Sequence, residues 1–231
     1  MKKIKAFIIN RDLVTWPKAM VEWMNNVPEL EPVILDNAST YPPLLEWYET
    51  DPCRVVRLPS NFGHKVLWSS GIIYKEITAD DDYFLLTDPD LDISTVPYDV
   101  IDKLKEAIHK YNLSKCGLAI RIDDMPNEYP LKEQVLIWET PFWNETHEEN
   151  LYKSPIDTTF ALHDAKQSRG HKIGGARLAG EYTLRHLPFY LTKDTVTEEF
   201  RYFCNHADSS STQATYLREW VNKSLEKRNE E

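Results

Sequence analysis

Short apolar runs alternate with amphipathic stretches through the first half of the chain, and each apolar run ends in polar residues. The runs predict strands over residues 3–10, 31–36, 53–58, 83–87 and 116–122. Helices are predicted between them over residues 15–23, 42–48, about 64–75 and 98–110, with Thr15 as a cap and prolines in two first turns. This alternation indicates an α/β fold with parallel βαβ units in a mostly parallel open sheet flanked by helices.

The alternation stops after Asp123, where prolines interrupt a stretch rich in Trp and Glu. Residues 156–164 have the β-branched character of a strand. Residues 195–207 and the chain from Thr212 onward are predicted to be helical. Because no repeat or linker is visible, we expect a single domain over residues 1–231, with a regular half (1–125) and an irregular half (126–231).

Composition and charge exclude several classes of protein. The chain has 231 residues and a formal net charge of −10, which argues against nonspecific binding to nucleic acid. No apolar run approaches about 18 residues, so no transmembrane segment is expected. Three scattered cysteines and an N-terminus unlike a secretory signal favour reduced thiols in the cytoplasm, or in the host cytoplasm if the source is a virus.

The segment Tyr83–Asp92 carries the most informative pattern, because its apolar run ends in three aspartates at alternate positions. Such carboxylates repel one another unless a cation neutralises them, and oxygen ligands suit Mg²⁺ or Mn²⁺ with substrate phosphates. A calcium loop is excluded, since its sixth and twelfth positions would hold Ile93 and Asp99. A solvated turn at Pro89 is the simpler alternative.

Every predicted parallel strand in this half ends in a polar set, and these sets should converge on one crevice. They comprise Asn10, Arg11 and Asp12; Asp36, Asn37, Ser39 and Thr40; residues 59–65; and Asp88 with Asp90. Any one of them is explained by a turn, and for Asn37 or Asn61 alone the turn is the favoured interpretation.

The segments FIINRD, VILDNAST, VVRLPSNFG and FLLTDPDLD resemble, in order and spacing, the nucleotide-sugar-binding half of glycosyltransferases with the GT-A (Rossmann-like) fold. They are most similar to family 2. The resemblance covers about the first 125 residues, and the rest matches more loosely through IDTTFAL and YTLRHLPFY. The chain departs from the family pattern because it lacks a Glu-Asp and a Gln-x-x-Arg-Trp motif, which puts the catalytic base and any processive activity in question.

The resemblance implies a metal-dependent transfer of a sugar from a nucleoside-diphosphate sugar, taken as a UDP- or dTDP-sugar, to a glycan or other hydroxyl acceptor. The metal, Mn²⁺ or Mg²⁺, would be bound by Asp90 and Asp88, with His206 as a third ligand. A polar residue at a helix C-terminus is an equally good interpretation of His206. The implied donor-binding residues are Asn10, Arg11, Asp36, Asn37, Asn61, Gly63, Lys65 and Asp88.

An inverting transfer requires a general base for the acceptor hydroxyl. Asp157, just before the TTFAL run, is the first candidate, and Asp164 and Glu139 are weaker ones. Trp138 and Trp143 could form an aromatic platform for the acceptor, with Arg185 and His186 as polar contacts. A surface ion pair is the alternative for Arg185 and His186.

Three other functions remain open at this stage. Asp90 and Asp92 resemble the nucleophile motif of haloacid-dehalogenase-type phosphatases, and Asp123–Asp124 their late acidic pair, although that family places the nucleophile on its first strand. A nucleotidyltransferase should carry a Gly-rich loop after strand one, where NRDLVTW has no glycine. A non-catalytic carbohydrate-binding protein is the third possibility.

Overall fold

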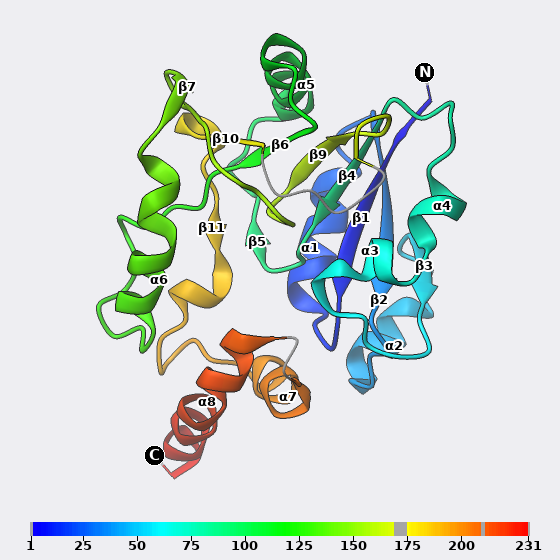
Figure 1. Cartoon of the computed structure of the whole chain (residues 1–231). Coiled ribbons are helices and arrows are strands. Elements are labelled where there is room, and N and C mark those ends of the chain that lie inside the picture. The colour runs from blue at the N-terminus through cyan, green and yellow to red at the C-terminus, as the bar shows by residue number, and fades with distance from the viewer. Residues whose placement is uncertain (1, 169–174, 209–210, 231) are drawn as a thin grey trace.

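A computed structural model of the chain describes residues 2–168, 175–208 and 211–230. The first strands and helices follow the apolar pattern closely: β1 (Ile4–Asn10), α1 (Thr15–Met24), β2 (Leu30–Asp36), α2 (Pro42–Tyr48), β3 (Arg54–Arg57) and β4 (Tyr83–Thr87). β1 and β2 pair in parallel from Ile4 opposite Leu30 to Asn10 opposite Asp36. The predicted α/β architecture, with a large sheet flanked by helices, is confirmed (Figure 1).

The segment predicted as one helix from about His64 to Lys75 is instead three short pieces. They are η1 (Gly63–Lys65), α3 (Val66–Ser69) and α4 (Ile72–Glu76). Gly71 interrupts the helix because it adopts a left-handed conformation, with φ of 74°. The Ser70 hydroxyl also donates to the carbonyl of Val66, a bond that competes with regular helix geometry.

The described residues form a nine-stranded sheet in the order β3-β2-β1-β4-β9-β6-β10-β8-β7. Its second half contains β6 (Lys115–Leu118), β7 (Thr146–Glu148), β8 (Leu151–Tyr152), β9 (Ala161–Asp164) and β10 (Ala176–Leu178). Only β9 and β8 run against the other strands, and β9 is inserted between β4 and β6. The second half therefore completes the same sheet as the first.

The strand predicted over residues 156–164 begins later, at Ala161. Residues 157–160 form bends, and Phe160 has a φ of 44°, which an extended strand does not allow. The predicted strand 116–122 is likewise shorter, because β6 ends at Leu118. The loop before β9 therefore carries Asp157 to the end of the sheet at which β4 finishes.

Alternating side chains of the central strands divide the core between the two faces of the sheet. Ala6 and Ile8 pack in one buried cluster with α1 and with α5 (Val100–Tyr111). Phe7 and Ile9 pack in a second cluster with α3 and α4. This alternation is the period of two that places successive side chains on opposite faces.

The part of the chain from residue 132 onward supplies the helices that surround the carboxyl end of the sheet (Figure 1). It contains α6 (Lys132–Glu139), η2 (Thr140–Trp143), η3 (Gly180–Tyr182), η4 (Leu187–Tyr190), α7 (Glu198–His206) and α8 (Thr212–Glu230). A two-stranded ribbon joins β5 (Leu91–Asp92) to β11 (Arg185–His186). The predicted helix 195–207 is confirmed as α7, and the helix predicted from Thr212 as α8.

The sequence predicted Thr15 as the cap of α1. In the structure, a residue that is distant in the sequence caps this helix instead. One carboxylate oxygen of Glu199, on α7, accepts the N–H groups of Val14 and Thr15 at 2.6 and 2.9 Å. Its other oxygen accepts the Thr15 hydroxyl at 2.6 Å. The negative charge suits a helix N-terminus and fixes α7 beside the first strand end. In the described part of the chain, no helix has both the length and the apolar character to cross a membrane.

Candidate functional site

The carboxyl ends of β1 and β4 open onto a small cleft of about 210 Å³. Seven of the residues that sequence reasoning assigned to donor or metal binding line it, namely Asn10, Arg11, Asn37, Asn61, Gly63, Asp88 and Asp90. The parallel register explains this convergence, because Asn10 stands opposite Asp36 and Ile8 opposite Thr87, so that successive strands end at one edge.

Asp88 and Asp90 form the acidic centre of this cleft. The N–H of Asp88 donates to the carbonyl of Thr158 at 2.9 Å, and its carboxylate accepts the Thr158 hydroxyl at 2.5 Å. Burial raises the pKa of Asp88 well above its ordinary value, and the charges of Asp90 and Asp157 raise it further. Placing these carboxylates together therefore costs electrostatic free energy unless a positive charge enters the cleft.

His186, on β11, places a basic side chain beside Asp90. Its Nε2 lies 3.3 Å from Oδ2 of Asp90. Burial lowers the pKa of His186, but the charge and hydrogen bond of Asp90 outweigh that effect, so that the pKa is raised overall. His186 lines the small cleft and also the larger one described below.

The donor atoms around Asp90 fit a magnesium or manganese ion that also binds phosphate. Oδ1 of Asp90 is buried and has no hydrogen-bond partner among the described residues. Within the same part of the chain, no three His, Cys, Asp or Glu side chains are arranged around one metal position. Mg²⁺ commonly uses only one or two carboxylates, with substrate phosphates and water completing its shell.

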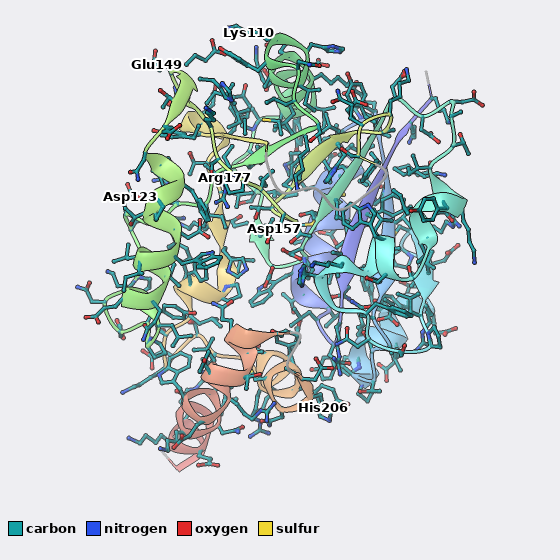
Figure 2. All side chains as sticks on the ribbon, viewed as in Figure 1. Lys110, Asp123, Glu149, Asp157, Arg177 and His206 are labelled. Atoms are coloured by element: carbon teal, nitrogen blue, oxygen red, sulfur yellow. The ribbon has the colours of Figure 1, made fainter. Side chains whose placement is uncertain are left out.

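The predicted third ligand, His206, is not brought to the two aspartates. Its ring stacks on Tyr202 at 3.9 Å between centroids, and its Nδ1 lies 2.8 Å from the carbonyl of Tyr202. Figure 2 shows His206 at the lower edge of the molecule, apart from Asp157. His206 is absent from the described residues that line either cleft.

A residue that sequence reasoning missed, Asp208, connects two predicted donor-binding residues. Its Oδ2 accepts from Arg11 at 3.0 Å and from Asn61 at 2.9 Å. Asn61 also accepts the N–H of Gly63, whose φ of 66° favours glycine. Asn37 donates to the carbonyl of Gly63 at 3.1 Å, so it supports this loop. The only signal for Asp208 in the sequence is the segment 205–208, in which His206 is the predicted metal ligand.

Asp36 lies behind the small cleft rather than on its wall. Its side chain is 0% exposed and contacts Nε of Arg57 at 3.3 Å and the hydroxyl of Tyr48 at 3.5 Å. Burial raises the pKa of Asp36, while Ser39 and Arg57 oppose that shift. Asp36 is not among the described residues lining either cleft, so a donor-binding role for it stays a prediction.

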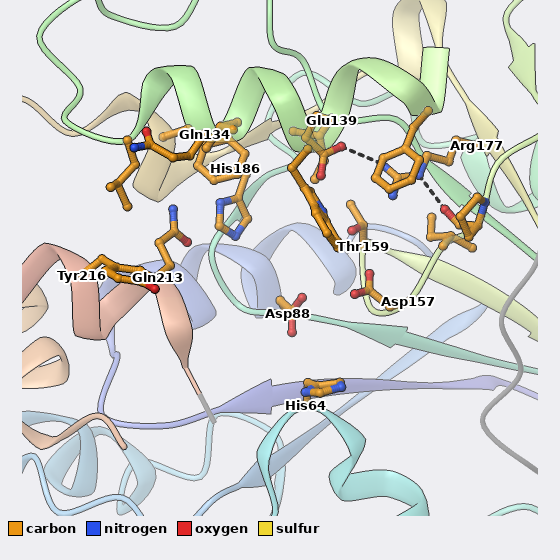
Figure 3. A pocket seen from close by; sticks show the side chains of 18 of the residues that line it. His64, Asp88, Gln134, Glu139, Asp157, Thr159, Arg177, His186, Gln213 and Tyr216 are labelled. Carbon is orange, nitrogen blue, oxygen red and sulfur yellow. Dashed lines mark hydrogen bonds and ion pairs between the residues drawn. The ribbon is translucent and has the colours of Figure 1, made fainter. Parts of the chain in front are cut away.

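A larger cleft of about 930 Å³ adjoins the first, and His64, Asp88, His186 and Gln213 line both (Figure 3). The larger cleft lies between the end of the sheet and helices α6 and α8. The predicted residues Lys65, Trp138, Glu139 and Asp157 line it. Figure 3 shows Asp157 close to Asp88, and Asp88 also lines the smaller cleft.

The three candidate bases occupy different places. Asp157 is exposed in the loop before β9, and one of its oxygens accepts the N–H of Thr158 at 2.8 Å. Asp164 lies opposite Tyr83, at the other end of β4 from Asp88. Glu139 is buried and its Oε2 accepts from Arg177 at 2.8 Å. Of the three, Asp157 is therefore the carboxylate that is both accessible and close to Asp88.

Arg177, which sequence reasoning missed, fixes the loop that carries Asp157. Its Nε donates to the carbonyl of Pro155 at 2.9 Å, and its guanidinium lies 4.1 Å from the ring centroid of Phe142. The Arg177–Glu139 ion pair is 6% exposed on each side (Figure 3). Burial raises the pKa of Glu139, and the charge of Arg177 opposes that rise.

The remaining predicted acceptor residues lie away from the cleft. Trp143 packs edge-on against Tyr152, with ring centroids 4.9 Å apart. Arg185 pairs with Asp124 and lies over the ring of Tyr190. Neither Trp143 nor Arg185 is among the described residues that line a cleft. For Arg185 the structure therefore shows the surface ion pair that the sequence left as an alternative.

The geometry does not favour the phosphatase alternative. Asp92 is turned into its own loop, where its Oδ1 accepts the N–H and hydroxyl of Ser94. Asp124 is occupied by Arg185 and Tyr190. In the described part of the chain, Asp90 and Asp92 do not line a common cleft, as a nucleophile and its acid partner would have to do.

Comparison with solved structures finds 45 chains of similar fold. No protein-family model and no curated protein matches the sequence. The crystal structure of S. aureus TarS 1–349 is similar with a TM-score of 0.48 and 11% identity, over 94% of this chain and 69% of that one. For the crystal structure of S. aureus TarS, the TM-score is 0.48 and the identity 10%, over 96% and 42% of the two chains.

A third similar structure is TarS 1–349 in complex with UDP, with a TM-score of 0.40 and 13% identity, over 71% of this chain and 47% of that one. The present chain thus spans less than half of two of the three structures. Similarities this distant concern the arrangement of the chain and not its chemistry.

Proposed function

We propose that the chain is a glycosyltransferase that binds a nucleoside-diphosphate sugar in the smaller cleft and a hydroxyl acceptor in the larger one. The observation that carries the proposal is the acidic centre at their boundary, where Asp88 lines both clefts and Oδ1 of Asp90 is buried without a partner among the described residues. A diphosphate cannot enter such a centre without a bridging cation. A carboxylate pair at the ends of parallel strands is therefore a reason to expect a metal–diphosphate ligand.

Asp90 and Asp88 would hold Mn²⁺ or Mg²⁺, which would stabilise the negative charge of the departing diphosphate as a Lewis acid. Asn10, Asn61 and Gly63 would contact the nucleoside, because they line the inner wall of the smaller cleft. Lys65 lines the larger cleft close to the boundary and would attract the phosphates. A UDP- or dTDP-sugar is the donor we propose.

The transfer itself would use Asp157 as general base. The carboxylate accepts the proton of the acceptor hydroxyl while the acceptor oxygen forms a bond to the anomeric carbon. The bond from that carbon to the diphosphate oxygen breaks, and its electron pair leaves with the nucleoside diphosphate. Attack from the side of the larger cleft, opposite the leaving group, inverts the anomeric configuration.

The proposal is tested by incubating the protein with a panel of nucleotide sugars and measuring nucleoside-diphosphate release. We expect release from at least one donor with Mn²⁺ or Mg²⁺ and none in excess chelator. Asp92→Asn is the matched control, since its carboxylate belongs to a local turn. It should leave the release unchanged. An inert panel, together with hydrolysis of p-nitrophenyl phosphate that Asp92→Asn abolishes, would instead support the phosphatase alternative.

A further inference from the structure

The larger cleft has a charged end and a mainly apolar remainder. Its charged side chains gather at the boundary with the smaller cleft, where His64, Asp88 and His186 belong to both. Most of the remaining wall is aliphatic and aromatic, with Ile120, Leu131, Val135, Phe142, Ile156 and Phe189, and it includes the uncharged polar side chains of Gln134 and Thr159. A ligand that fills this cleft must therefore present a polar end to Asp88 and an apolar body to the remainder.

The one charged pair deep in the wall does not alter this character. Arg177 and Glu139 neutralise each other at 2.8 Å, and each is 6% exposed. The ring of Phe142 covers the guanidinium, with 4.1 Å between the Arg177 Cζ and the ring centroid. Nε of Arg177 donates to Pro155 and Nη1 donates to Glu139, so the pair satisfies part of its own hydrogen-bonding capacity inside the wall.

Two large aromatic side chains line the larger cleft and yet stay open to solvent. Trp138, on α6, is 70% exposed and Tyr216, on α8, is 69% exposed. A single exposed apolar side chain needs no explanation, but two large aromatic side chains on the wall of one cleft form the kind of apolar patch that marks a ligand-binding groove. They come from two different helices that both face the end of the sheet, so a ligand in the cleft would bury both.

We infer that the acceptor is an alcohol or phenol with an apolar body, such as an aromatic or isoprenoid alcohol, rather than a glycan. This inference rests on the proposed function and specifies its acceptor. A saccharide would bury several hydroxyls along a wall that has few partners for them, and each unpaired hydroxyl costs free energy. A single hydroxyl at the polar end would meet Asp157, while the body packs on Trp138 and Tyr216. A volume of about 930 Å³ suits a ligand of that kind.

The test is equilibrium dialysis of the 231-residue chain against 2-naphthol and, separately, against maltose, without nucleotide or metal. We expect saturable 2-naphthol binding that weakens about tenfold in Trp138→Ala and several-fold in Tyr216→Ala, as loss of a large apolar contact predicts. Tyr74→Ala is the matched control, because Tyr74 is also 69% exposed but lies on α4, outside the described lining of both clefts. It should bind like the wild type.

The inference is overturned if 2-naphthol does not bind, if both cleft variants bind it as the Tyr74 control does, or if maltose binds more tightly and is the ligand lost in Trp138→Ala. A protein that transfers sugar to maltose but does not bind 2-naphthol would retain the proposed function and lose this acceptor assignment. A protein that binds 2-naphthol as expected but releases no diphosphate from any donor would retain the apolar ligand site and lose the transferase.

Discussion

Asp157→Asn is expected to lower turnover by about 10²–10⁴-fold, the usual contribution of a general base. The asparagine keeps an oxygen for the N–H of Thr158, so the loop before β9 should retain its conformation. Donor and metal affinity should stay close to wild type, because Asp157 lines the larger cleft and is not among the described residues that line the smaller one. The measurement is the rate of transfer at saturating donor, together with donor affinity determined separately.

The control for this prediction is Asp164→Asn. Asp164 is the last residue of β9, whereas Asp157 lies in the loop before that strand. Asp164 pairs with Tyr83 of β4, and its carboxylate accepts hydrogen bonds from its neighbours Lys166 and Gln167. Its substitution should leave turnover almost unchanged. Near-normal turnover in Asp157→Asn, or a product that keeps the anomeric configuration of the donor, would show that Asp157 is not the base of an inverting transfer.

Arg177→Met is expected to destabilise the protein by about 3–5 kcal/mol at pH 7, because it leaves the Glu139 carboxylate buried without its partner. Burial already raises the pKa of Glu139, and without Arg177 the rise should be larger. A carboxyl whose pKa is raised on folding lowers stability only at pH values at which it is ionised in the unfolded chain. At those pH values, folding must either protonate the carboxyl or bury its charge. The loss should therefore be small below about pH 4 and grow as the pH rises above the ordinary pKa of Glu, about 4.3.

Urea unfolding at pH 4 and at pH 7 measures this effect. Lys223→Met is the control, since it breaks the Glu219–Lys223 pair, which is 80% and 68% exposed, and it should leave the free energy of unfolding almost unchanged at both pH values. Addition of Glu139→Gln to Arg177→Met should restore part of the loss at pH 7. Equal destabilisation at both pH values would contradict the assignment of the loss to a buried, unpaired carboxylate.

The sequence predicted β1, β2 and β4 well because each is a continuous apolar run buried on both faces of the sheet. It also located the acidic centre, since carboxylates that follow such a strand must lie at its carboxyl end. The position of β9 between β4 and β6 was not predictable in this way. Antiparallel pairing across more than 40 residues leaves no signal in local periodicity.

The sequence did not predict three important polar side chains for the same reason, because their partners are distant along the chain. Arg177 lies in a short strand among glycines and alanines, and its partner Glu139 is 38 residues away. Asp208 contacts Arg11 across 197 positions, and Glu199 caps α1 across 185. Each of these polar contacts exists only after the last third of the chain has folded over the end of the sheet. Local patterns identify residues at strand ends but not the distant residues that hold them.

The central claim, that the acidic centre binds a nucleoside diphosphate through a divalent cation, is tested most directly by titration calorimetry with UDP and dTDP. We expect binding of at least one of them to wild type in Mn²⁺, no binding in excess chelator, and no metal-dependent binding to Asp90→Asn, whose circular dichroism should match wild type. Equal affinity in Mn²⁺ and in chelator, or an Asp90→Asn variant that binds the nucleotide as the wild type does, would contradict the claim.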